Sequence, residues 1–243
     1  MSSWNLKARS KNLIHRFVTL ALVLSIGYAL VRVILAPLDV EIMDQYARTK
    51  SDYVLMLVQC ILGLLVIRLP GWIEKSREID IPDEIEIIYF VFLYMAIVLG
   101  EVRNFYFLIP HWDNILHAFS GGMLGALGFA LVNILNETER LHIELSPFFV
   151  AFFAFCFALA AGAVWEIYEF LMDGFLGLNM QKYALEDGTR LVGRMALSDT
   201  MEDLIVDGVA ALLVSVLGYF SLKRKIRKEA LRVAAEEPEM DEL

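Results

Sequence analysis

The sequence predicts an all-α fold, a polytopic membrane bundle of about six transmembrane helices. Of its 243 residues, 58% are hydrophobic, and the mean hydropathy of +0.58 lies far above that of a soluble domain. The apolar residues gather in long runs that charged and turn-forming residues separate. A net charge of −9 argues against a nucleic-acid partner, so the expected partner is the lipid bilayer.

The first stretch of the chain predicts a cytoplasmic segment followed by the first span. Basic residues mark residues 1–16, and an uncharged run then extends from Phe17 to Val31. A cleaved signal peptide is the rival interpretation, but no small-x-small cleavage site follows the run and Arg32 interrupts it. We therefore expect an uncleaved first span at about 17–37.

Five further spans are expected in the membrane domain, which covers residues 17–222. Each is an apolar run bounded by polar residues, and they lie at about 53–69, 86–106, 113–135, 147–170 and 203–222. Residues 38–52 are expected as a short interfacial helix or a solvated loop, and residues 174–198 as a lid or a re-entrant piece. A basic and then acidic cytoplasmic tail, residues 223–243, follows the last span.

The distribution of basic residues predicts the orientation. With six spans and the N-terminus inside, the cytoplasmic segments carry fourteen of the Lys and Arg residues and the outer segments carry six. Cytoplasmic loops of membrane proteins are enriched in Lys and Arg. Both termini are therefore expected in the cytoplasm, with the protein in the inner (cytoplasmic) membrane.

Several spans reach the length of a bilayer only if they include polar residues. A transmembrane helix needs about 20 residues, whereas the third run is uncharged only over 87–100 and the sixth only over 208–222. The third to sixth spans therefore include or border a set of polar residues. These are Glu101, Asn104, Asp113, His117, Glu166, Glu169, Asp203 and Asp207.

In the expected topology these groups all lie in the outer part of the membrane. The third and fifth spans end on that side, and the fourth and sixth begin there. A charge in lipid costs about 2.5–3.5 kcal/mol even on the mildest scale, so the groups should face one another. Their helical spacings agree, because Asp113 and His117 are four residues apart and Asp199, Asp203 and Asp207 follow at intervals of four. The sequence thus predicts one acidic, outward-facing site.

Small residues are expected on the opposite faces of the fourth and fifth helices. Gly121, Gly125 and Gly128 mark the fourth span, and an alanine-rich stretch over 158–163 marks the fifth. Small residues let membrane helices approach closely. These two helices are therefore expected to pack at the centre of the bundle.

The chemistry of the cluster leaves three interpretations open. A divalent cation (Mg²⁺, Mn²⁺, Ca²⁺ or Zn²⁺) suits carboxylates with one imidazole. Protonated carboxyls would suit a proton relay, and arginines such as Arg32, Arg103 or Arg194 could pair with the acids. For the first interpretation, the expected ligands are Asp113, His117, Glu166 and Asp203, with a supporting polar set of Glu101, Asn104, Glu169, Asp199 and Asp207. Asp199 has an alternative role as a helix N-cap.

An ordered set of these residues resembles a known family. Gly100-Glu101, Asn104-Phe105-Tyr106, Trp112-Asp113, His117, Trp165-Glu166 and Asp203 with Asp207-Gly208 are similar to the pattern of YjdF-type prokaryotic membrane proteins of unknown function. The layout is more distantly similar to VanZ-like proteins, which are associated with resistance to lipoglycopeptide antibiotics. The resemblance covers about residues 85–220 and implies a polar site in a prokaryotic inner-membrane protein.

The leading hypothesis is a site that binds a divalent cation together with an envelope or lipid-linked small molecule. A proton- or cation-coupled transporter and a non-catalytic structural membrane protein are the alternatives. Soluble-enzyme motifs such as HExxH, GxSxG and the P-loop are missing. Whether the protein is an enzyme is therefore left open by the sequence.

Overall fold

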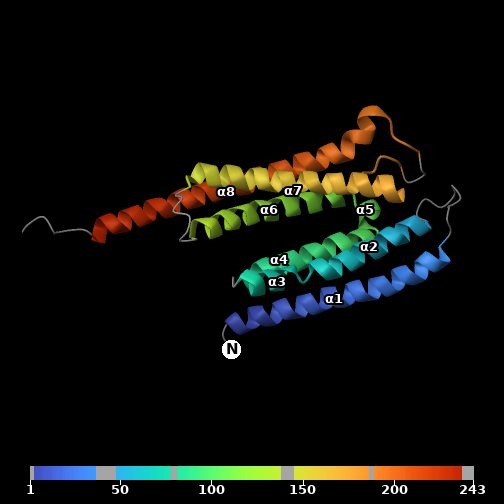
Figure 1. Cartoon of the computed structure of the whole chain (residues 1–243), viewed down its shortest axis with the longest axis horizontal. Helices are drawn as coiled ribbons and strands as arrows, with labels where there is room; N and C mark the ends of the chain where they lie inside the picture. Colours follow the sequence, from blue (N-terminus) through green and yellow to red (C-terminus); the bar gives the residue numbers. More distant parts are fainter. Residues whose placement is uncertain (1–2, 37–47, 78–80, 138–144, 186–188, 237–243) are drawn as a thin grey trace, which may run out of the picture. The chain divides into compact units, whose positions relative to one another are not determined.

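The computed structural model describes residues 3–36, 48–77, 81–137, 145–185 and 189–236 (Figure 1). Over these ranges the chain is helical, and the only β-structure is an isolated bridge between Ala184 and Arg190. Six helical stretches are long and apolar enough to cross a membrane. This confirms the predicted all-α fold and the number of candidate spans. Most of the expected loop 38–52 lies outside the described residues.

The elements follow one another as helices with short connections. Their bounds are α1 (Ser3–Leu35), α2 (Lys50–Val66), α3 (Leu69–Arg77), α4 (Asp83–Leu93), the π-helix η1 (Tyr94–Val102), α5 (Phe105–Leu108), α6 (Trp112–Glu137), α7 (Pro147–Leu176), the 3₁₀-helix η2 (Gly193–Leu197) and α8 (Ser198–Glu236). The chain divides into two compact units, residues 1–116 with 168–199, and residues 117–167 with 200–243. Three helices, α6, α7 and α8, run through the boundary.

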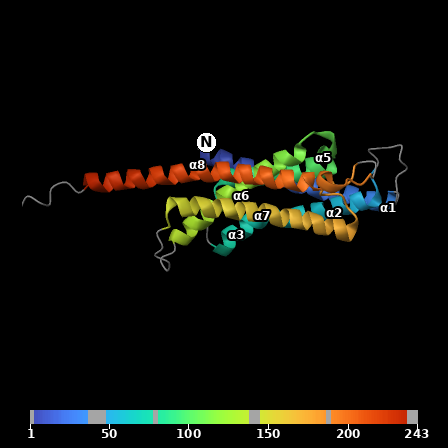
Figure 2. The same cartoon turned by 90° about the horizontal axis from the view of Figure 1, so that it is seen from above.

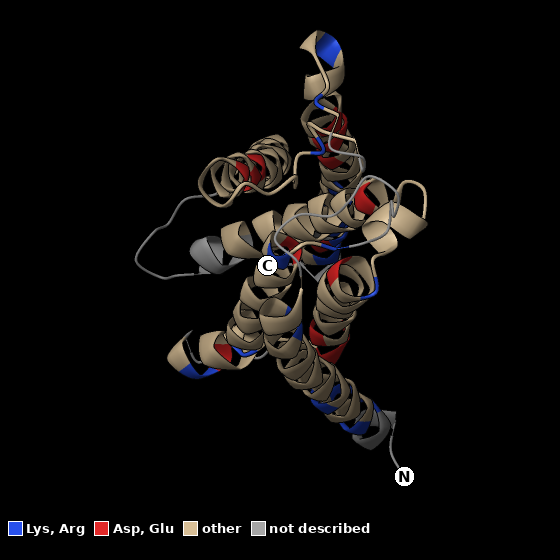
Figure 3. Cartoon of the chain, turned by 90° about the vertical axis from the view of Figure 1, so that its right-hand side faces the viewer, with Lys and Arg blue, Asp and Glu red and all other residues tan. Residues whose placement is uncertain are grey.

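The first unit has a hydrophobic core in which α1 packs against α2 and α4. Leu22 of α1 and Met56 of α2 are fully buried there. Gly63 allows the close approach, because a Cβ added to it would lie 2.6 Å from Ile97 and 3.3 Å from Leu22. Lys11 adds polar contacts near the start of α1, since its ammonium pairs with Asp83 and Glu86 (basic and acidic residues are coloured in Figure 3).

The third candidate span changes from an α-helix to a π-helix before it ends. The amide of Arg103 donates to the carbonyl of Val98 at 3.0 Å, a π-type bond between residues five apart. Asn104 then adopts a left-handed conformation, with φ 65°, which asparagine tolerates better than most residues. The expected helix over 86–106 is therefore interrupted at Asn104, and the short helix α5 follows.

The second unit is a bundle of α6, α7 and α8, which run alongside one another in Figures 1 and 2. Glycines mark its helix contacts: a Cβ on Gly128 would lie 2.7 Å from the backbone of Ala154, and one on Gly218 would lie 2.3 Å from Phe129. Close backbone approach through small residues stabilises helix packing in membranes. The approach of Gly128 to Ala154 agrees with the expected contact between α6 and α7.

The face on which the small residues lie differs from the expectation. A Cβ on Gly121 would lie 2.9 Å from the backbone of Asp207, and one on Gly162 would lie 2.3 Å from its carboxylate. Small residues therefore border the acidic group and do not lie on the opposite face. The physical reason is that His117 and Gly121, four residues apart, share one face of α6.

Candidate metal-binding site

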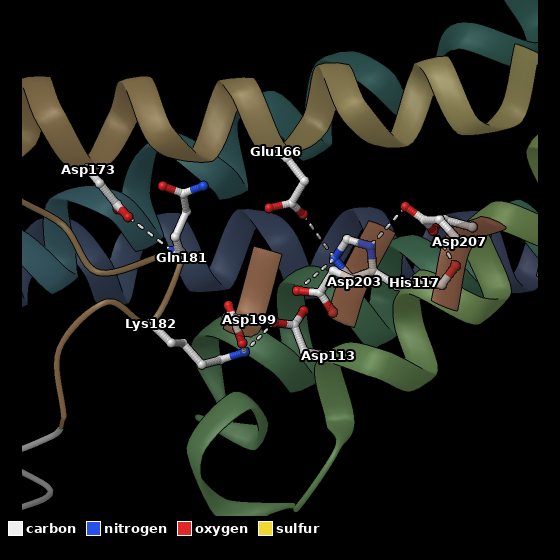
Figure 4. Close-up of polar contacts among 10 residues, drawn as sticks. Asp113, His117, Glu166, Asp173, Gln181, Lys182, Asp199, Asp203 and Asp207 are labelled. Carbon is white, nitrogen blue, oxygen red and sulfur yellow. Dashed lines mark hydrogen bonds and ion pairs between the residues drawn. The ribbon is translucent and has the colours of Figure 1, made fainter. Parts of the chain in front are cut away.

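His117 lies at the centre of a buried polar cluster in the second unit (Figure 4). Its Nδ1 atom is 3.2 Å from Oδ2 of Asp207, a hydrogen bond that joins α6 to α8. His117 is 6% exposed and Asp207 is 2% exposed. Because the carboxylate accepts the bond, the proton lies on Nδ1 when the ring is neutral. The lone pair of the neutral ring is then on Nε2.

Two further carboxylates face the other nitrogen of His117. Nε2 lies 3.8 Å from Oε1 of Glu166, on α7, and 3.8 Å from Oδ2 of Asp203, on α8. Both distances exceed that of a hydrogen bond, which ends near 3.2 Å. Both carboxylates are buried, Glu166 at 4% exposed and Asp203 at 2%. One imidazole nitrogen thus faces two oxygens from two other helices.

The local sequence explains why these groups meet. Asp203 and Asp207 are four residues apart on α8, so both project from one face of that helix. Gly121 and Gly162 leave room for the Asp207 carboxylate between α6 and α7. Larger residues at either glycine would separate the helices. The sequence thus places three carboxylates around one imidazole.

The His117 cluster contains more acidic side chains than basic ones. Burying an ionised carboxylate is expensive unless it is paired or coordinates a metal. One histidine supplies at most one positive charge for three carboxylates. A divalent cation would neutralise more of this charge than a proton on the histidine.

A second charged group surrounds Lys182. The ammonium of Lys182 donates hydrogen bonds to Oδ2 of Asp113 and, at 3.0 Å, to Oδ1 of Asp199 (Figure 4). Asp113 lies in the first turn of α6 and Asp199 in the first turn of α8. Burial by itself lowers the pKa of Lys182, but the attraction of Asp113 and Asp199 outweighs burial and raises that pKa above its ordinary value. Lys182 is therefore protonated at neutral pH.

The segment that carries Lys182, residues 177–185, is held by its own hydrogen bonds. The carboxylate of Asp173 accepts from the amides of Met180, at 2.7 Å, and Gln181, at 3.0 Å. The side chain of Asn179 makes two bonds to the backbone of Ala184, at 2.7 and 3.0 Å. This segment falls within the residues expected as a lid or re-entrant piece.

A third polar group, in the first unit, surrounds the end of η1. The guanidinium of Arg48 donates to the backbone carbonyl of Glu101 at 2.5 Å and to the side-chain oxygen of Asn104 at 2.8 Å. Arg48 thus satisfies a carbonyl at the C-terminal end of the π-helix, where no following amide is in place to do so. Asn104 has a local structural role here.

Three of the expected ligands, Asp113, His117 and Asp203, place one ligand atom each within 4.8 Å of one another. The contacts of the expected residues fall into several groups. His117, Glu166, Asp203 and Asp207 gather in the second unit. Asp113 and Asp199 pair with Lys182, whereas Asn104 contacts Arg48. Glu169 is buried, at 6% exposed, in the first unit.

The basic partners are Lys182 and Arg48, which the sequence did not single out. The sequence offers Arg32, Arg103 and Arg194 as partners, but Arg32 lies over the ring of Tyr53, 4.7 Å from its centroid. Lys182 lies in the loop after the fifth span, and hydropathy does not predict the geometry of a loop. Asn179, three residues before Lys182, is the nearest sequence signal of a structured turn.

Comparison with known proteins shows the family. The model of the predicted membrane proteins described as DUF2238 matches residues 16–224. The chain belongs to this family. A relative in Thermotoga maritima, an uncharacterised protein, is 29% identical over 147 residues, which are 60% of this chain and 67% of the relative. No solved structure matches.

Membership in this family supports the assignment as a membrane protein but assigns no function. Membership in DUF2238 agrees with the six apolar helices and assigns no activity, metal or ligand. The YjdF-type and VanZ-like resemblances gain no support from these matches. The matched range does contain all four residues of the His117 cluster.

Proposed function

We propose that this DUF2238 protein is an inner-membrane protein that binds a divalent cation through Asp113, His117 and Asp203, with Glu166 as a further candidate ligand. Asp207 holds the histidine by accepting a hydrogen bond from Nδ1. One observation carries the proposal: Asp113, His117 and Asp203 each offer one ligand atom, and these atoms all lie within 4.8 Å of one another. In addition, Nε2 of His117 faces an oxygen of each of two buried carboxylates, Glu166 and Asp203, at 3.8 Å.

The distances from Nε2 of His117 to the oxygens of Glu166 and Asp203 suit a shared cation better than direct hydrogen bonds. Ligand atoms about 2.1 Å from a tetrahedral Zn²⁺ lie about 3.4 Å apart. Neighbouring oxygens of an octahedral Mg²⁺ lie closer, at about 3.0 Å. The observed 3.8 Å needs a closure of only a few tenths of an ångström for Zn²⁺. We therefore name Zn²⁺ first, ahead of Mn²⁺, Mg²⁺ and Ca²⁺.

Asp207 completes a carboxylate–histidine pair of the kind found behind metal ligands. A metal-bound histidine usually donates its other N–H to a carboxylate, which fixes the ring and raises its basicity. Oδ2 of Asp207 accepts that bond, and Oδ1 is buried with no hydrogen-bond partner among the described residues. A carboxylate in this position stabilises the imidazole most strongly when a bound metal draws positive charge onto the ring.

Three protein ligands leave a fourth position for water or a small molecule. This is the arrangement of catalytic zinc sites, in which the metal activates the bound water. The expected location of the cluster in the outer part of the membrane favours an envelope or lipid-linked ligand. The same proposal places both termini in the cytoplasm.

The test is elemental mass spectrometry of detergent-purified protein after exposure to Zn²⁺, Mn²⁺, Mg²⁺ and Ca²⁺. Wild type should retain one cation per chain, and His117→Ala should lose it. His111→Asn is a matched control, because His111 is exposed and its left-handed backbone suits asparagine. Equal metal in wild type and His117→Ala, or none in either, would overturn the proposal and favour a proton relay or a structural network.

A further inference from the structure

We propose that the C-terminal part of α8 binds the headgroup of an anionic phospholipid through Arg224, Lys225 and Lys228. The residues belong to the second unit alone. They include none of the His117 cluster, so this inference does not depend on the proposed function. Two features carry it: a hollow beside this part of α8, and the order of the residues along the helix face that lines it.

A shallow hollow of about 480 Å³ lies along this part of α8. Its lining changes from apolar to basic in the direction of the chain. The lining residues are Leu217, Phe220, Ser221, Arg224, Lys225 and Lys228. Counted from the first of these, the others follow after 3, 4, 7, 8 and 11 residues, which is the spacing of a single face of an α-helix. One helix face therefore presents both kinds of side chain to the hollow.

The length of α8 puts the apolar and basic parts of this face at different depths in a bilayer. The helix has 39 residues and is therefore about 58 Å long, whereas a whole bilayer is about 40–45 Å thick. With the sixth span at the expected 203–222, Leu217 and Phe220 lie inside the hydrocarbon, close to its edge. Arg224 and Lys228 then lie about 3–9 Å beyond that edge, at the depth of the lipid headgroups.

The face is open to a lipid. In Figures 1 and 2 the C-terminal part of α8 runs on past the ends of α6 and α7, which belong to the same unit. Leu217 is 70% exposed and Phe220 is 52% exposed, and the three basic side chains are exposed as well. Within the described part of the chain, no acidic side chain pairs with Arg224, Lys225 or Lys228. The apolar part is thus free to contact an acyl chain and the basic part to contact a phosphate.

The charge of the segment selects an anionic headgroup over a zwitterionic one. Residues 223–233 contain six basic residues and one acidic residue, Glu229. Clusters of about four to eight Lys and Arg directly after a transmembrane helix attract anionic lipids. An arginine can hold a phosphate through two parallel N–H donors, and a lysine adds a point charge. A zwitterionic headgroup also carries an ammonium, which the same side chains repel.

Two charge-matched double variants separate a lipid site from a general effect of basic residues. Basic residues after a span also set the orientation of a membrane protein, and for that role the helix face on which they lie is irrelevant. Arg224→Gln/Lys228→Gln removes an Arg and a Lys, four residues apart, from the hollow. Lys223→Gln/Arg227→Gln removes a Lys and an Arg with the same separation from outside its lining. Glutamine is a good helix former, so α8 should persist in both.

The measurement is native mass spectrometry of the full chain in detergent, titrated with phosphatidylglycerol or phosphatidylcholine. Wild type should bind phosphatidylglycerol more tightly. The variant Arg224→Gln/Lys228→Gln should lose affinity for it by about tenfold or more, whereas Lys223→Gln/Arg227→Gln should stay within about twofold of wild type. Inorganic phosphate should not displace the lipid, because it has no acyl chain to place against Phe220.

Three results would overturn the inference. Equal losses in the two double variants would mean that any two charges of the segment matter alike. Equal wild-type affinities for the two lipids would remove the selection for an anionic headgroup, and displacement by inorganic phosphate would indicate a site for free anions. If Arg224→Gln/Lys228→Gln does not fold, Lys225→Gln alone should lower the affinity for phosphatidylglycerol by about threefold. An unchanged affinity in that variant contradicts the site.

Discussion

At the scale of single residues, the pairing of His117 with Asp207 decides how the cluster can work. The hydrogen bond on Nδ1 leaves the lone pair of the neutral ring on Nε2, which is the atom that faces Glu166 and Asp203. A protein that used the cluster only to join helices would gain little from this orientation. The roles of the two nitrogens can be tested one at a time.

Replacing Asp207 by asparagine should weaken Zn²⁺ binding while leaving the three proposed ligands in place. The amide can still accept from Nδ1, but the stabilising negative charge is lost, so affinity should fall by about 10- to 100-fold. Competition with a chelator of known affinity measures the change. Glu202→Gln is the control, because Glu202 is an exposed acid on the same helix. Equal affinities in wild type and Asp207→Asn would contradict the role of Asp207.

The two glycines on either side of the α7–α8 contact should respond differently to alanine. A Cβ at Gly162 would lie 2.3 Å from Oδ2 of Asp207, so Gly162→Ala should destabilise the bundle by about 1–3 kcal/mol. The nearest atom to a Cβ at Gly208 is 3.7 Å away, and alanine favours a helix by about 1 kcal/mol over glycine. Gly208→Ala should therefore be neutral or stabilising. Thermal unfolding in detergent measures both, and equal effects would contradict the packing described.

At the scale of elements, the end of the third span is the main departure from the expected helices. The π-helix η1 ends at Val102, Asn104 is left-handed, and Arg48 bonds to the carbonyl of Glu101 and to Asn104. Hydropathy could not predict this, because the same apolar run satisfies an α-helix or a π-helix. The isolated asparagine after a charged pair was the only local signal.

Two substitutions at Asn104 separate its backbone and side-chain contributions. Asn104→Gly removes the bond from Arg48 but suits the left-handed conformation, so its cost should be about 1 kcal/mol. Asn104→Ala loses the same bond and adds strain of about 1–2 kcal/mol. Unfolding of the purified protein should therefore rank alanine as the less stable variant. A reversed order would contradict the left-handed assignment.

At the scale of the whole molecule, the sequence was informative about spans and partly informative about the site. Hydropathy predicted the fold class and six candidate spans because a long apolar helix depends only on local composition. Helical spacing and the need to bury charge predicted that His117, Glu166, Asp203 and Asp207 belong together. The pairing of Asp113 and Asp199 with Lys182 could not be predicted, since it depends on the conformation of a loop.

The proposed orientation makes a prediction for the whole chain. A reporter that fluoresces only when it folds in the cytoplasm should be bright when fused after Leu243. The same reporter inserted after Gly193, in the segment expected outside, should be dark. The opposite pattern would place the His117 cluster on the cytoplasmic side and remove the argument for an envelope ligand.

The central claim is that a cation is bound by His117 and buried carboxylates. X-ray absorption at the zinc edge of the Zn²⁺-loaded protein tests it most directly, because imidazole gives a distinct multiple-scattering pattern. The proposal predicts one imidazole nitrogen and oxygen ligands at about 2.0–2.2 Å, with the imidazole signal lost in His117→Ala. Zinc surrounded by oxygen alone in the wild-type protein would contradict it.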